Sequence, residues 1–135
     1  MGDGTVISKS SPVQIGSSSW TAVSAGINHT LAIRSGGTLF GWGRNVEGQL
    51  TTAGKFETHS WTAVTSGFSH TVATRSDGMI FAWGRNNEGQ LGNGATVVRS
   101  NPVQIGSSSW IAVSSGRYHT AAIRSDGYLF TWGLS

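Results

Sequence analysis

Three histidines stand at the same place in three copies of one sequence repeat: His29, His70 and His119. Imidazole nitrogens are common metal ligands, so a ring of them could bind a metal ion or an anion. Ligation requires the rings to converge, however, and residues that occur once per repeat are held apart by the repeats. We therefore expect these histidines to be structural and to fix the turn into the next strand by hydrogen bonds. We expect neither a metal site nor a cofactor.

Arginines recur in two sets. The first set is Arg34, Arg75 and Arg124. It could form a basic rim that binds phosphate or an acidic partner. The second set is Arg44 and Arg85, accompanied by Glu47 and Glu88. These acid and base pairs favour local bracing of a loop over a ligand site. The net charge of +3 is too small to favour nucleic-acid binding.

No Ser-His-Asp set stands out, because serines are abundant throughout the turns of this chain. We expect no catalytic residues and no enzymatic activity. The variable positions are better candidates for recognition. Phe68 and Tyr118 lie beside the repeated histidines, where the first copy has Asn28. We expect them to contact a protein or glycan partner. The loops 51–60 and 94–101 also differ between copies and could present a face to a partner.

These candidate residues are positioned by the repeat itself. Its cores span residues 20–43, 61–84 and 110–133, and two tryptophans at a constant spacing bound each core. Length varies only between the cores, as expected for loops. We treat residues 1–135 as a single domain because repeats bury their surfaces against their neighbours.

The repeat unit predicts short strands. In the first copy we expect strands at 20–25, 29–34 and 38–42, separated by glycine-containing turns. A fourth strand is predicted around 13–15 and 103–105. The second strand places Leu31 and Ile33 on one face and small residues on the other. Bulky faces that stack on flatter ones are typical of propeller blades, so we expect an all-β protein of four-stranded antiparallel blades, about three per chain. Trp42, Trp83 and Trp132 are the expected packing residues.

Composition agrees with this class. The chain has 135 residues, 20 glycines, two prolines and no cysteine. Disulfides and thiolate zinc sites are therefore excluded, although the compartment is not identified. We see neither a signal-peptide pattern nor an apolar run that would span a membrane.

The second copy contains the run SGFSHTVATRSDGMIFAWGRNNEGQLG from Ser66 to Gly92. This run, repeated in register, resembles the repeat of the regulator of chromosome condensation family. The resemblance implies a β-propeller, usually of seven four-stranded blades. It implies little about function, since that family includes an exchange factor, chromatin binders, ubiquitin-ligase domains and an inhibitor protein. The exchange factor acts through an inserted wedge, and this sequence has no comparable insertion.

Three repeats are too few to close such a ring, and an open arc would expose a blade face at each end. We expect identical chains to complete the ring, with a dimer of six blades favoured and a trimer of nine possible. Residues 1–15 resemble the segment before the third copy, so we expect them to complete a blade, that of a neighbouring chain. The expected assembly residues are Val6, Ile7, Val13 and Ile15.

The sequence leaves three alternatives for the function of the chain. The first is a non-enzymatic scaffold that self-assembles and presents loops for protein interaction. The second is a carbohydrate- or surface-binding module. The third is a fragment, or an amplified or engineered repeat, whose main property is assembly; near identity of residues 12–20 and 102–110 favours this reading.

Overall fold

The computed structural model describes residues 2–50, 55–56 and 60–134. In these ranges the chain forms strands and connecting loops, arranged as three antiparallel sheets. We call the sheets blade 1, blade 2 and blade 3. Blade 1 contains β1 (Trp20–Ala25), β2 (His29–Arg34), β3 (Leu39–Gly43) and β4 (Lys55–Phe56). Blade 2 contains β5 (Trp61–Ser66), β6 (His70–Arg75), β7 (Ile80–Gly84) and β8 (Arg99–Gln104). Blade 3 contains β9 (Trp110–Ser115), β10 (His119–Arg124) and β11 (Leu129–Gly133).

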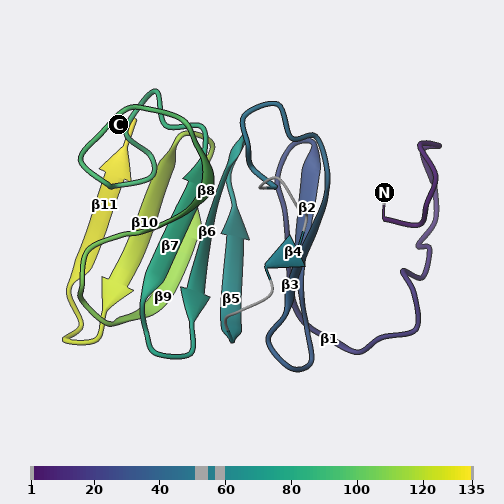
Figure 1. Ribbon diagram of the computed structural model, residues 1–135, viewed down its shortest axis with the longest axis horizontal. Coiled ribbons are helices and arrows are strands. Elements are labelled where there is room, and N and C mark those ends of the chain that lie inside the picture. The colour runs from purple at the N-terminus through teal and green to yellow at the C-terminus, as the bar shows by residue number, and fades with distance from the viewer. Residues whose placement is uncertain (1, 51–54, 57–59, 135) are drawn as a thin grey trace.

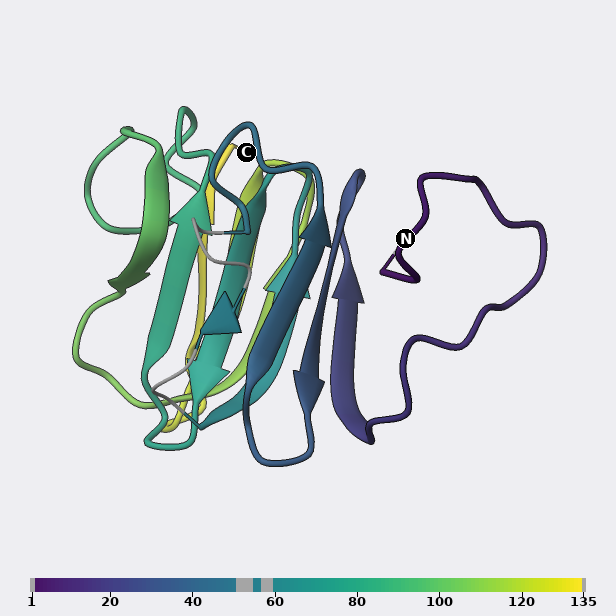
Figure 2. The ribbon, with the colours of Figure 1, turned by 45° about the vertical axis from the view of Figure 1, so that its right-hand side comes forward.

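The three blades stand side by side, with blade 2 in the middle, and residues 2–19 extend beyond blade 1 at the opposite side from β11 (Figures 1 and 2). Within each blade the strands follow chain order. The first strands of the blades are joined across the seams: Ser66 N–H donates to Ser24 Oγ at 2.9 Å, and Ser115 N–H donates to Thr65 Oγ1 at 2.9 Å. The arrangement therefore has the stacked-blade form that the repeat predicts.

Glycine allows the tight turns between the second and third strands. Gly78 and Gly127 have φ of 83° and 91°, a left-handed conformation that glycine adopts without a Cβ clash. In blade 2, Gly78 N–H donates to Arg75 O at 2.9 Å, and β6 and β7 then pair from His70–Gly84 to Thr74–Ile80. The predicted strands of the repeat cores are thus confirmed to within a residue at their ends.

The core lies between the blades. Leu31, Ile33 and Leu39 of blade 1 pack with Leu50 against Trp61 and Trp83 of blade 2. At the next seam, Val72, Ile80 and Leu91 of blade 2 pack against Trp110 and Trp132 of blade 3. At both seams the aliphatic face of one blade thus packs against the aromatic face of the next.

Two expectations about the strands need correction. Blade 3 has three strands among the described residues, so not every blade is four-stranded. Residues 13–15 form no strand, whereas Val103 and Gln104 lie in β8 and pair with β7. The difference has a simple cause: β8 has a partner strand beside it, and residues 13–15 have none in the chain alone.

Candidate interaction site

The repeated histidines lie at the start of β2, β6 and β10 and differ in burial. His29 and His70 are buried, while His119 is exposed. His70 Nε2 lies 3.1 Å from Thr120 Oγ1 of the next blade, and that hydroxyl donates to Gln90 O at 2.8 Å. Because the hydroxyl has a single proton, His70 Nε2 must be the protonated nitrogen in this contact. The pKa of both His29 and His70 is lowered to about 4, by burial in each case and for His70 also by the charges of His29 and His119.

Glycine makes room for these histidines. A Cβ on Gly67 would lie 2.1 Å from the His70 ring and 2.5 Å from the carbonyl oxygen of Gly116 in the next blade. Only a residue without a side chain fits between the ring and that carbonyl. Gly26 has the same relation to His29 and to the carbonyl of Gly67, so His29 and His70 lie in different seams, whereas His119 is exposed on blade 3. The described residues contain no group of three acidic, histidine or cysteine side chains that could hold a metal ion.

Two Gly-Gln-Leu segments, at residues 48–50 and 89–91, also link neighbouring blades. The Gln49 carbonyl accepts hydrogen bonds from Thr71 Oγ1 at 3.1 Å and from the Trp83 indole N–H at 2.8 Å. Gln90 accepts from Thr120 and Trp132 in the same way, at 2.8 and 3.0 Å. The side chain of Gln49 also bonds its own loop, because its Oε1 accepts from Glu47 N–H at 2.9 Å. The backbone role of the two glutamines across the seam had no signal in the sequence.

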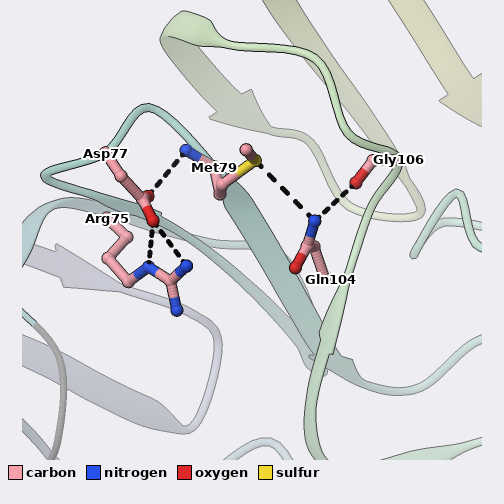
Figure 3. Close-up of polar contacts among 5 residues, drawn as sticks. All are labelled: Arg75, Asp77, Met79, Gln104 and Gly106. Atoms are coloured by element: carbon pink, nitrogen blue, oxygen red, sulfur yellow. Dashed lines mark hydrogen bonds and ion pairs between the residues drawn. The ribbon is translucent and has the colours of Figure 1, made fainter.

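The first arginine set lies where the second strand enters the turn, and two of its members, Arg75 and Arg124, are engaged by aspartates. Arg75 donates to Asp77 Oδ2 from Nε at 2.8 Å, and Asp77 also accepts from Met79 N–H at 3.1 Å (Figure 3). Arg124 bonds Asp126 in the same manner, with Nη2 to Oδ2 at 2.6 Å. The hydrogen bonds lower the pKa of both carboxyl groups and raise that of both guanidinium groups.

Arg34 differs from its two counterparts. Gly36 stands where the other copies have aspartate. The Arg34 guanidinium lies over the Phe40 ring, 4.4 Å from its centroid, and 5.5 Å from that of Trp20. The predicted role of this arginine set in partner binding stays a prediction.

The variable residues Phe68 and Tyr118 meet across the seam between blades 2 and 3. Their ring centroids are 5.6 Å apart, although the two residues do not occupy equivalent positions in the repeat. Phe68 is two residues before its histidine and Tyr118 one residue before. The Arg117 guanidinium lies 5.1 Å from both ring centroids, and that of Arg85 lies 5.1 Å from Tyr118. We call these four residues the seam cluster.

The two arginines of the seam cluster were not among the predicted recognition residues. Arg85 is held by Glu88, with Nη2 to Oε1 at 2.9 Å, which confirms the local pairing expected for that arginine. Arg117 is exposed, and no carboxylate among the described residues forms an ion pair with it. Beside the cluster lies a hollow of about 450 Å³, which is lined at equivalent positions of the three blades by Ile27, Phe68 and Arg117. Of the two predicted variable loops, the one at 94–101 is described, whereas 51–54 and 57–59 lie outside the described residues.

The end blades expose their outer faces. On the aliphatic face, Leu39 and Ile80 are fully buried, whereas their counterpart Leu129 in blade 3 is 67% exposed. On the aromatic face of blade 1, Val23 is 70% exposed, whereas its counterparts Val64 and Val113 are half-buried. Among the predicted assembly residues Val6, Ile7 and Val13 are exposed, and Ile15 is half-buried. No helix that is long and apolar enough to cross a membrane occurs in the described part of the chain.

Comparison with known proteins agrees with this architecture. A family model described as the regulator of chromosome condensation (RCC1) repeat matches residues 77–123, and a second model of the same description matches residues 20–49 and 61–90. Together these matches cover more than half of the chain. No curated protein matches.

Among solved structures the chain is similar to human WBSCR16, with 24% identity and a TM-score of 0.78, over 86% of this chain and 34% of that one. It is also similar to Prp20p from Saccharomyces cerevisiae, with 21% identity and a TM-score of 0.77, over 89% of this chain and 32% of that one. The chain thus spans about a third of the length of these structures. The repeats, the stacked blades and the family matches agree, and the chain belongs to the regulator of chromosome condensation (RCC1) repeat family.

Proposed function

We propose that this chain is a non-enzymatic propeller scaffold whose copies assemble through their end blades and present loops to a protein partner. The observation that carries the proposal is the contrast between equivalent residues: Leu39 and Ile80 are fully buried by a following blade, and Leu129 is exposed. A second copy of the chain would offer Leu129 the same kind of aromatic face that covers the other two.

That aromatic face is shaped to receive a blade. A hollow of about 350 Å³ on blade 1 is bounded by Trp20, Val23 and Trp42 on one side and by Gln14 and Ile15 on the other. At the seam between blades 2 and 3, the equivalent tryptophans and valine are covered by Ile80 and its apolar neighbours. The hollow therefore corresponds to the space that a preceding blade would fill.

Parts of the N-terminal segment have the same local geometry as their counterparts before blade 3. Gly16 and Gly106 have φ of 62° and 64°. Gln14 Nε2 donates to Gly16 O at 2.8 Å, as Gln104 Nε2 donates to Gly106 O at 2.9 Å (Figure 3). Gly2 packs against Trp42 as Gly92 packs against Trp132, so closely that a Cβ added at these glycines would lie 2.5 and 2.6 Å from the indole nitrogens. Residues 9–14 correspond to β8, and in the proposed assembly they would form the fourth strand of blade 3 in the neighbouring copy.

The internal pairing of β7 with β8 specifies the expected register. Phe81 pairs with Gln104, Ala82 with Val103 and Gly84 with Arg99, and Ile105 N–H donates to Ile80 O at 2.9 Å. If the same register joins two copies of the chain, the expected pairs are Phe130 with Gln14, Thr131 with Val13 and Gly133 with Lys9. Ile15 would then bond Leu129 and become buried, as Ile105 is.

This register distinguishes among the predicted assembly residues. Val6 and Ile7 correspond to Thr96 and Val97, which stay exposed beside the completed blade 2. Val13 and Ile15 correspond to Val103, which is half-buried in β8, and to Ile105, which is buried in the core. Assembly should therefore depend on Val13 and Ile15 more than on Val6 and Ile7.

Cysteine cross-linking tests the proposal directly, because the natural chain has no cysteine. We expect Val13→Cys and Thr131→Cys, made in separate chains and mixed under mild oxidation, to form a covalent dimer. Val6→Cys mixed with Thr131→Cys is the matched negative control. Ala82→Cys with Val103→Cys in one chain tests whether a cysteine pair in the same register forms a disulfide within a blade.

Native mass spectrometry of the unmodified chain supplies the second measurement, with a dimer expected. A monomeric mass, together with equal cross-linking by Val6→Cys and Val13→Cys, would contradict assembly through identical chains. In that case the exposed faces would be explained better by further blades of a longer chain.

A further inference from the structure

We propose that the seam cluster of Phe68, Arg85, Arg117 and Tyr118 binds a carboxylate side chain of an acidic peptide segment. The inference rests on the proposed role of the chain as a scaffold that presents loops, but it does not require assembly. The site lies at the seam between blades 2 and 3, which a single chain forms completely.

Arg117 is the group that defines the ligand. Its guanidinium lies within 5.1 Å of the centroids of Phe68 and Tyr118, a distance at which cation–π attraction is substantial. Its backbone is fixed as well, because Arg117 O accepts a hydrogen bond from Phe68 N–H at 3.1 Å. A guanidinium held over aromatic rings keeps the N–H groups at its edge free to grip a carboxylate with two parallel hydrogen bonds. The cation is thus positioned before any ligand arrives.

The surrounding charges limit the ligand to one acidic group. Arg85 is engaged by Glu88, whose hydrogen bond raises the pKa of the guanidinium, and the negative charges of Glu88 and Glu47 act in the same direction. Arg117 is therefore the cation of the cluster that lacks an ion-pair partner among the described residues. Nucleic acids bind through several phosphates at once and need several free cations, which this site does not offer. A single carboxylate matches its charge.

The aromatic rings also argue against a neutral sugar as the ligand. Sugars would have to stack on ring faces, but Arg117 lies over both Phe68 and Tyr118. The adjoining hollow of about 450 Å³, bounded by Ile27 and Phe68, offers an apolar surface next to the cation. An acidic residue followed by an apolar one fits this combination, with the carboxylate on Arg117 and the apolar side chain in the hollow.

The cluster is specific to one seam. At the seam between blades 1 and 2 the equivalent positions of Phe68, Tyr118 and Arg117 hold Ile27, Ser69 and Phe68. Arg44 stands at the position of Arg85, so the two seams share that arginine. The same backbone frame therefore carries Arg117 with two aromatic residues at one seam, and one aromatic residue without that second cation at the other. This difference is the pattern expected when a repeat frame is kept constant and binding is placed on its variable positions.

The test uses a fluorescein-labelled peptide, Gly-Glu-Phe-Glu-Gly, and its counterpart in which glutamine replaces both glutamates. Fluorescence anisotropy is measured against the full chain at low salt. We expect the acidic peptide to bind, the glutamine peptide to bind at least about tenfold more weakly, and Arg117→Gln to weaken acidic-peptide binding by about tenfold or more. Added salt should weaken the same interaction.

Arg44→Gln is the matched control, because Arg44 is exposed, stands at the position of Arg85 beside the other seam and lies outside the seam cluster. Its substitution removes the same charge and should leave the affinity within about twofold. Native mass spectrometry of the same samples separates this result from the assembly proposal. Equal affinity of Arg117→Gln and the natural chain, no difference between the two peptides, or tighter binding of a neutral oligosaccharide or a short DNA duplex would overturn the inference.

Discussion

Acid should destabilise this fold in a pH range set by its buried histidines. His70 is fully buried, and burial lowers its pKa to about 4, whereas an exposed histidine titrates near 6.5. Above pH 6.5 the side chain is neutral in both the folded and the unfolded chain, so it does not make the free energy of unfolding depend on pH. Between pH 6.5 and 4 the unfolded chain binds a proton that the folded chain does not. The free energy of unfolding therefore falls as pH is lowered.

The size of the effect follows from the shift. Each pH unit in this window costs about 1.4 kcal/mol for one histidine, so His70 alone should account for about 3 kcal/mol between pH 6.5 and 4. His29, whose pKa is also lowered to about 4 by burial, should add a comparable loss. The carboxyl groups of Asp77 and Asp126 also have lowered pKa values, but they start from 3.8, so their contribution is lost at still lower pH.

Urea unfolding followed by tryptophan fluorescence at intervals from pH 7.5 to 4.5 measures the slope. We expect His70→Gln to have about half the pH dependence of the natural chain. His119→Gln, at the equivalent and exposed position of blade 3, should keep the full dependence at concentrations where the chain is monomeric. The reasoning would be refuted if both variants had the same slope, because burial would then not decide which histidine resists protonation.

Three further substitutions test the seams. Leu39→Ala should destabilise the chain by about 2–5 kcal/mol, because Leu39 is fully buried against blade 2. Leu129→Ala should cost under about 1 kcal/mol in the monomer, because Leu129 is exposed. Urea unfolding compares the two variants, and similar losses would contradict the assignment of Leu129 to an exposed end face. Thr120→Val should cost about 1–3 kcal/mol, because it removes the hydroxyl between His70 and the Gln90 carbonyl, and thermal unfolding that matches the natural chain would argue against that link.

Repetition explains why the strands could be predicted and the seam contacts could not. The strand that the structure places at His29–Arg34 follows from alternation and from the glycine turn after it, which are local features present in every copy. Comparison of copies, however, aligns equivalent positions, whereas a seam brings residues of two different copies into contact. Phe68 meets Arg117, its equivalent in the next blade, and Tyr118, one residue further along, because the loop of one blade lies beside the loop of the next. No single copy of the repeat contains that relation.

The same reasoning limits what can cover the aromatic face of blade 1. In blades 2 and 3 the preceding part of the chain covers this face in two ways. Its apolar side chains pack against the rings, and one of its backbone carbonyls accepts a hydrogen bond from the indole of Trp83 or Trp132. In blade 1 the equivalent donors are the Trp42 indole and the Thr30 hydroxyl, and no preceding blade lies beside them in the described structure. An occupant that supplied only apolar surface would leave these donors unpaired on burial, at a cost of about 1–3 kcal/mol each. The face therefore favours another polypeptide, which brings a carbonyl together with its side chains, over a purely apolar ligand.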